Sequence, residues 1–276
     1  SNICLFINIM FIIQCSFFFR MQVEPLFSGL GTPSEAPIKR DRDGKFGRVT
    51  PVDARELYAA DAEALLRAQH GFPIKSDGQL PWFDLFRPLY YGMHGVEVGS
   101  QTRWYETNGF VHPPRIVDVP HAGQPSIADI LSSDRIAGAM SIAVIGPYSM
   151  LRATENQVGV PEEDIAAAFA EQYRRNLTGL LGVAHLQFFE PSLSVDARER
   201  GMDRAMLDYA AGIYQQLCGF PIVMHLPWGN FNILHPYLAD FQVSGFGVDL
   251  LETVTPSPDI SLDGKLLTAG VLYAGS

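Results

Sequence analysis

Ionisable side chains stand at the ends of several apolar runs in this sequence. Glu190 follows one run, His225 closes another, and the acids Asp249 and Glu252 come at the end of a third. Imidazole and carboxylate groups transfer protons near neutral pH and bind divalent metals. An acid at the end of a buried strand is also costly to bury without a purpose. These four residues are therefore the first candidates for catalysis or metal binding.

A second set of polar residues lies in turns nearer the N-terminus. Asp77 and Gln79 flank Gly78 after one apolar run, and Gly31 and Thr32 follow an earlier one. Gln79 keeps hydrogen-bonding ability without charge, and the Gly31-Thr32 turn offers backbone contacts to a ligand. Asp77 is open to two interpretations, because the same residue type caps helices.

Short apolar runs alternate with helical patterns along the chain, and this order is typical of βα units around a parallel sheet. Helices are expected at about 50–70, 161–181, 201–217 and 231–239. The apolar runs predict seven strands, at 26–31, 72–77, 140–145, 185–189, 221–225, 245–250 and 266–273. The order predicts a TIM-type (β/α)8 barrel over residues 21–276, incomplete at its C-terminal end. Such a barrel would gather the strand-end residues at one rim.

Residues 94–125 interrupt this alternation. They are rich in glycine and proline, and Pro113, Pro114 and Pro120 fit poorly in a central strand. We therefore expect an excursion beyond the rim of the barrel.

Composition narrows the class of protein. The chain of 276 residues has 47% hydrophobic and 18% charged residues, which suits one globular domain. Its net charge of −10 argues against a nucleic-acid partner. Cys4, Cys15 and Cys218 lack metal-binding spacing and are expected to be reduced thiols in a cytoplasmic protein.

The first twenty residues are unusually apolar. Residues 3–19 lack a basic start and a small-residue cleavage site, and the run is slightly short for a membrane helix. Residues 1–20 are interpreted as an N-terminal extension of uncertain origin; a membrane segment or signal, or a packed element, are the alternatives. Because seven strands leave one barrel position open, we also hypothesise that residues 3–19 cover or fill the gap beside residues 266–273.

Two stretches resemble motifs of one enzyme family. Residues 103–108 read R-W-Y-E-T-N and residues 186–191 read L-Q-F-F-E-P. They resemble the K-W-F-D-T-N and I-D-E-P-A-L motifs of the cobalamin-independent methionine synthase family. Five shorter matches follow in the family's order: L-G-T-P at 30–33, S-D-G-Q at 76–79, G-P-Y-S at 146–149, V-D-L at 248–250 and L-T-A-G-V at 267–271.

The resemblance implies a TIM barrel in which zinc holds homocysteine as a thiolate that attacks the methyl group of a folate. His225 matches the histidine of the family's H-x-C ligand pair, but Pro227 replaces the cysteine. Glu252, or Asp249 in another register, would be the acidic ligand, and no cysteine follows Cys218. Zinc is therefore expected only at a partial site.

The substrate side departs from the family as well. Gln79 replaces the acid that holds the amino group of homocysteine, and Phe189 replaces the acid before Glu190. Glu190 and Gln79 are expected to orient the acceptor. Trp104 would stack on a flat ligand such as a pterin, or else pack beneath the excursion.

Three functional interpretations remain. The first is methyl transfer from a folate or corrinoid donor to a small thiol such as homocysteine. The second is a non-catalytic or partner-dependent paralogue resembling the family's zinc-free N-terminal barrel, with a partner chain that completes the barrel or the site. The third is a metal-free relative resembling uroporphyrinogen decarboxylases, which share the fold.

Overall fold

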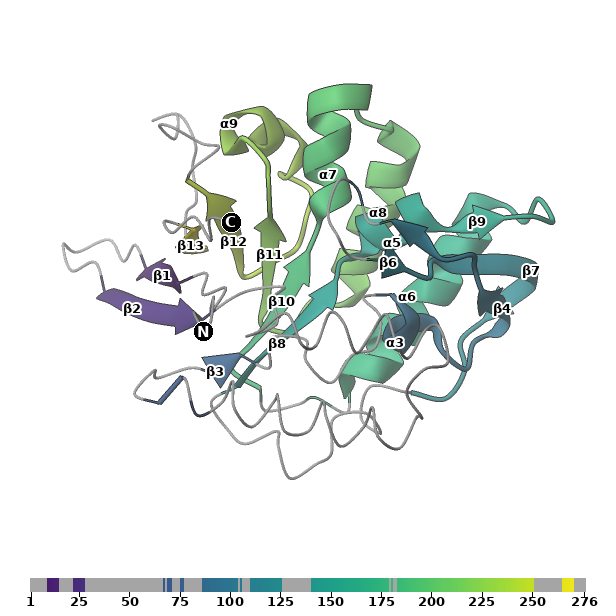
Figure 1. Cartoon of the computed structure of the whole chain (residues 1–276), viewed down its shortest axis with the longest axis horizontal. Coiled ribbons are helices and arrows are strands. Elements are labelled where there is room, and N and C mark those ends of the chain that lie inside the picture. The colour runs from purple at the N-terminus through teal and green to yellow at the C-terminus, as the bar shows by residue number, and fades with distance from the viewer. Residues whose placement is uncertain are drawn as a thin grey trace, which may run out of the picture.

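The main sheet of the protein has eight strands, most of them parallel (Figure 1). The computed structural model describes residues 9–14, 22–27, 67, 69–70, 75–76, 86–103, 105, 110–125, 140–178, 180, 183–250 and 265–270. In spatial order the strands are β2 (Gln22–Phe27), β1 (Ile9–Gln14), β13 (Leu266–Gly270), β12 (Gly245–Asp249), β11 (Ile222–Leu226), β10 (His185–Phe189), β8 (Met140–Ile145) and β3 (Lys75–Ser76).

The parallel part of this sheet agrees with the sequence prediction. The six strands from β3 to β13 run parallel, and β8 and β10 have the predicted bounds. β2 lies four residues earlier than the predicted first strand. The two outermost strands, β2 and β3, contact each other, but no pairing joins them within the described residues. The α/β fold is confirmed, whereas closure of a (β/α)8 barrel is not.

β1 lies between the last and the first strands that the sequence predicts for the barrel. It pairs with β13 on one side and with β2 on the other, antiparallel to both. The hypothesis that the N-terminal apolar segment fills the gap is therefore confirmed for Ile9–Gln14. The connection from β1 to β2 is seven residues long, which suits an antiparallel hairpin and is too short for a parallel crossover. The strand position that a partner chain was expected to complete is thus occupied by this chain itself.

Helices cover one face of the parallel strands. The larger ones are α5 (Pro147–Ala153), α6 (Glu162–Thr178) and α8 (Arg204–Gln216). Shorter ones are α3 (Arg87–Tyr90), α7 (Pro191–Val195), which continues as a π-helical turn Asp196–Arg200, and α9 (Phe231–Leu234), which continues as a 3-10 turn His235–Tyr237. None of the helices among the described residues is long and apolar enough to cross a membrane. The cytoplasmic location stays a prediction.

The alternation of side chains along β10 separates the two faces of the sheet. Phe188 packs against Tyr173 of α6 and Tyr214 of α8, with ring centroids 5.8 and 5.6 Å apart. All three rings are fully buried, and each such side chain contributes about 1.5–3 kcal/mol to folding. Phe189, the next residue, therefore points to the opposite face, away from the helices.

The excursion forms its own small sheets at one side of the main sheet (Figure 1). β7 (Pro114–His121) lies between β4 (His94–Val98) and β9 (Glu155–Asn156), and β5 (Thr102–Arg103) pairs with β6 (Phe110–Val111). These residues lie outside the main sheet, as the sequence predicted, although β7 is itself the central strand of a three-stranded sheet. Pro114 is the first residue of β7, and Pro120 lies where the register with β4 shifts at a bulge, so neither position disrupts a regular ladder.

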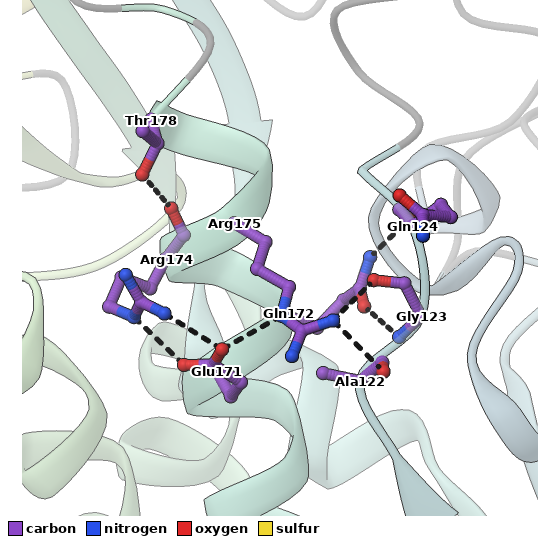
Figure 2. A network of polar contacts seen from close by, with 8 residues as sticks. All are labelled: Ala122, Gly123, Gln124, Glu171, Gln172, Arg174, Arg175 and Thr178. Carbon is purple, nitrogen blue, oxygen red and sulfur yellow. Dashed lines mark hydrogen bonds and ion pairs between the residues drawn. The ribbon is translucent and has the colours of Figure 1, made fainter.

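α6 holds this excursion by polar contacts with the end of β7 (Figure 2). The Arg175 guanidinium donates to the carbonyl oxygens of Ala122 and Gly123, at 3.3 and 3.1 Å. The side chain of Gln172 accepts from the Gly123 amide at 2.8 Å and is fully buried. These bonds satisfy backbone groups just beyond β7, so they fix where the excursion meets the helical layer.

Candidate functional site

The candidate site lies at the carboxyl-terminal edge of β8, β10, β11 and β12. Parallel pairing brings the ends of these four strands side by side. The residues at or just beyond these ends are Gly146, Glu190, Trp228 and Asp249, and His225 lies one position before the end of β11. In open and closed parallel α/β sheets, this edge is where ligands bind.

Glu190 has a carboxylate that is enclosed by the protein. It accepts hydrogen bonds from the backbone amides of Tyr148 and Ser149 at 2.9 and 2.8 Å, and from the Tyr214 hydroxyl at 2.8 Å. The residue is fully buried. Burial raises the pKa of Glu190 to about 7, and the hydrogen bonds that it accepts oppose that rise.

Gly146 makes room for this carboxylate. A Cβ added at position 146 would lie 2.2 Å from Oε1 of Glu190, a distance at which real Cβ atoms are not found. The backbone amide of Glu190 also donates to the carbonyl oxygen of His225 at 2.9 Å. Glu190 therefore joins the turn after β8 to the ends of β10 and β11. In this arrangement its carboxylate holds the turn after β8 beside the ends of β10 and β11.

His225 lies on the face of the sheet opposite the helices. Its ring stacks on Phe189, with centroids 4.8 Å apart and an angle of 15° between the planes. The residue is 3% exposed, and its Nε2 atom has no hydrogen-bond partner among the described residues. Burial, together with the nearby His185, lowers the pKa of His225 to about 3. The imidazole is therefore neutral at physiological pH, and its buried Nε2 atom is left without a hydrogen-bond partner among the described residues.

The described residues do not fit a zinc site. A protein zinc site uses three or four nitrogen, sulfur or oxygen donors. No group of three or more His, Cys, Asp or Glu residues lies close enough together to hold a metal within the part of the chain that the structure describes. Asp249 instead accepts a hydrogen bond from the Trp228 amide at 3.3 Å, and Cys218 is exposed.

An aromatic pair at this edge was not singled out by the sequence. Tyr105, from the excursion, lies edge-on to Trp228, with ring centroids 6.1 Å apart and an angle of 75°. The Tyr105 hydroxyl shares a 2.5 Å hydrogen bond with the Ser192 hydroxyl of α7. Tyr105 and Trp228 have backbone φ angles of 48° and 61° and are the two non-glycine residues with positive φ among those described. Such strain clusters at functional sites.

An ion pair also contacts α5, the helix that follows the turn after β8. Asp196 is buried, and its carboxylate accepts from the Tyr148 hydroxyl at 2.9 Å and from Arg152 Nε at 2.8 Å. Burial raises the pKa of the Tyr148 hydroxyl, and Asp196 adds to the rise. Asp196 belongs to the π-helical turn after α7, a local form that is frequent at functional sites.

The structure brings Glu190, His225 and Asp249 to one edge, as the sequence predicted. Six other predicted site residues lie outside the described residues: Gly31, Thr32, Asp77, Gln79, Trp104 and Glu252. Their roles remain predictions. No comparable signal in the sequence marked Ser149 and Ser192, although both follow strand-end turns that had been identified.

Comparisons with known proteins agree on one family. No family model matches the chain. It is 24% identical over 171 residues to a 5-methyltetrahydropteroyltriglutamate–homocysteine methyltransferase of Streptococcus gordonii, covering 59% of this chain and 22% of the relative. It is 21% identical over 214 residues to a methionine synthase of Sulfurisphaera tokodaii, covering 75% of this chain and 62% of the relative. The chain therefore spans between about a fifth and two thirds of the length of these relatives.

Solved structures with the same fold belong to the same group. A protein described as a vitamin-B12-independent methionine synthase from Listeria monocytogenes superposes with a TM-score of 0.60 at 18% identity, covering 89% of this chain and 79% of that one. A B12-independent methionine synthase from Shewanella sp. W3-18-1, solved with selenomethionine, gives 0.57 at 14% identity, covering 76% and 68%. Sequence relatives and fold together identify the chain as a divergent relative of the cobalamin-independent methionine synthases.

Proposed function

We propose that this chain is a methyltransferase-like protein that transfers a methyl group to a small thiol, such as homocysteine, from a folate or corrinoid donor. The observation that carries the proposal is the neutral imidazole of His225 at the carboxyl-terminal edge of the sheet, whose Nε2 has no partner among the described residues. Support comes from the relatives, one of which is named for methyl transfer to homocysteine. A further relative of the same fold was solved with selenomethionine, an analogue of a methylated thiol product.

The described residues can be given roles in binding. His225 Nε2 would exchange a hydrogen bond with the acceptor, and Asp249 lies beside Trp228 where an amino group could be held. In the transfer, a bond forms between the acceptor sulfur and the methyl carbon while the bond from that carbon to the donor breaks. The electron pair of the broken bond stays with the donor, which leaves without its methyl group, and the proton lost by the thiol is taken up by the departing donor or by solvent. His225 is a weak base for that proton, because its pKa is lowered to about 3.

The residues outside the described part complete the proposal. Gln79 would orient the acceptor together with Glu190. Gly31, Thr32 and Asp77 would add contacts. Trp104 would stack on a flat ligand such as a pterin. Glu252 would be the second ligand if a metal binds with His225.

A second candidate function is favoured by the donor set. Among the described residues, His225 belongs to no group of three or more His, Cys, Asp or Glu side chains that could hold a metal, and the Glu190 carboxylate already accepts hydrogen bonds from protein donors. Both features suit a non-catalytic paralogue that binds a ligand without turning it over. This candidate keeps the same binding edge and differs only in the absence of methyl transfer.

One set of measurements on the full chain separates the two candidates. The protein is incubated with homocysteine and 5-methyltetrahydrofolate, methionine is measured by mass spectrometry, and binding of homocysteine is measured by calorimetry. The same assays are repeated with zinc supplied and with His225→Ala. Methionine formation that His225→Ala abolishes supports the methyltransferase. Saturable binding without methionine supports the paralogue, and neither binding nor product overturns both.

A further inference from the structure

The buried Glu190 carboxylate is connected to the aromatic pair at the edge of the sheet by an unbroken series of contacts. Ser149 donates its backbone amide to the carboxylate at 2.8 Å, and its hydroxyl also hydrogen bonds to Glu190. The same Ser149 hydroxyl oxygen accepts from the Ser192 amide at 3.2 Å. Glu190 and Ser192 are thus linked through one side chain, although they lie in the turn that begins α7 and Ser149 lies in α5.

The series continues to the exposed end of the site. The Ser192 hydroxyl shares its hydrogen bond with the Tyr105 hydroxyl, and the Tyr105 ring contacts the ring of Trp228. Trp228 is 36% exposed, and its amide is held by Asp249. The contacts therefore lead from a fully buried carboxylate to an aromatic ring that meets solvent.

The groups that form this series have little freedom to take other partners or positions. Ser149 is fully buried and Ser192 is 1% exposed, so water does not readily replace either hydroxyl group. The Glu190 carboxylate fills the space that a Cβ at Gly146 would occupy, so the two segments are in close contact. Tyr105 and Trp228 both hold left-handed backbone conformations, which persist only when surrounding contacts impose them.

We propose that Glu190 is a positioning residue, which sets the placement of the Tyr105–Trp228 pair through Ser149 and Ser192, and that this pair forms the rim that contacts the ligand. Glu190 in this role does not touch the ligand. The inference rests on the proposed function only for the identity of the ligand site, since the coupling itself is a property of the free protein.

The test follows Trp228 directly and needs no ligand. The full chain is labelled with 5-fluorotryptophan, and the ¹⁹F resonance of Trp228 is assigned by its loss in Trp228→Phe. Glu190→Gln keeps the shape of the side chain but replaces one of its two acceptor oxygens, which bind backbone amides, with an NH2 donor. Ser149→Ala, Ser192→Ala and Tyr105→Phe each remove one hydroxyl group in the series. Glu171→Gln, which removes an acid from the solvent-facing network of α6, is the matched control.

We expect the Trp228 resonance to shift in Glu190→Gln and in each of the three hydroxyl variants, and to stay in place in Glu171→Gln. Thermal unfolding checks that each variant is folded. An unshifted Trp228 resonance in folded Glu190→Gln overturns the proposal. If Glu190→Gln does not fold, Ser149→Ala decides, because it leaves the carboxylate and its backbone donors in place. If the ¹⁹F shifts are absent, the result of the ligand-binding assay is unaffected. If the proposed function is wrong, the ¹⁹F shifts are still expected.

Discussion

The imidazole of His225 occupies the space in which any other residue at Gly247 would carry its side chain. A Cβ added at Gly247 would lie 2.1 Å from Nδ1 of His225 and 2.7 Å from Cε1. The two residues are direct register partners on β11 and β12. The glycine therefore determines where the imidazole can lie.

This relationship predicts that Gly247→Ala displaces His225 and lowers the free energy of unfolding by about 1–3 kcal/mol, as overpacking of a filled core does. Urea denaturation measures the change. Gly212→Ala is the matched control, because Gly212 lies in α8 and an added Cβ there meets no atom within 4 Å. The control should stabilise the protein by about 0.5–1 kcal/mol. Equal effects at both positions would contradict the role of Gly247.

Glu190 predicts a specific dependence of stability on pH. Its folded-state pKa of about 7 lies above the ordinary value of 4.5, so the folded protein binds the proton more tightly than the unfolded chain. Its contribution to stability is therefore greatest below about pH 4.5 and is lost as the pH rises to about 7. At 1.36 kcal/mol per pKa unit, the loss is roughly 3 kcal/mol.

Glu190→Gln removes this titration. The difference in unfolding free energy between wild type and Glu190→Gln, measured by urea titration from pH 4.5 to 8, should change by that amount in favour of the variant as the pH rises. Subtracting the variant cancels groups of opposite sign, such as Glu171, whose pKa is lowered to about 2 by Arg174 and Arg175. A difference that is constant with pH would refute the raised pKa.

His225 predicts the opposite slope. Its folded-state pKa of about 3 lies below the ordinary 6.5, so the unfolded chain takes up the proton first. Stability from this group is complete above pH 6.5 and is lost as the pH falls from there toward 3. The histidine ring resonances, assigned by comparison with His225→Asn, should show no titration of His225 between about pH 5 and 8. A midpoint near the ordinary value of 6.5 would mean that the ring reaches water.

The place of β1 predicts that its backbone amides are needed for the sheet. Ile12 pairs with Thr268 on one side and with Glu24 on the other. Ile12→Pro removes an amide donor from an interior strand and should destabilise the protein by about 3 kcal/mol or more. Ile12→Thr keeps the amide and a β-branched side chain, so it is the control and should have a smaller effect. Chemical denaturation of both variants decides, and equal small effects would place Ile9–Gln14 outside the sheet.

The sequence predicted those features that depend on local pattern. Continuous apolar runs, buried on both faces, located β8 and β10 at their observed bounds. Glu190 and His225 were found because each breaks such a run at its end. The antiparallel direction of β1 could not be predicted in this way. An apolar run does not show whether the strand is parallel or antiparallel to its neighbours.

The missed features depend on contacts between distant segments. Tyr105 and Ser192 are 87 positions apart, and neither is unusual in its own surroundings. Gly146 and Gly247 are required because the side chains of Glu190 and His225, from neighbouring segments, fill the space where their Cβ atoms would lie. Pro120 lies in β7 where the register with β4 shifts, an irregularity that depends on the pairing of the two strands. Such placements are decided by tertiary packing, which no local pattern encodes.

The pairing of β1 with β13 also has a consequence for synthesis on the ribosome. Met10 pairs with Gly270, which lies 260 positions further along the chain. The β1–β2 hairpin is available as soon as its own residues have emerged, but one edge of β1 must wait until β13 has been translated. At about 5–20 residues per second, that interval is on the order of ten seconds to a minute. An apolar strand with an unpaired edge is open to association with other chains throughout this time, so the nascent protein should be a client of chaperones that bind such strands.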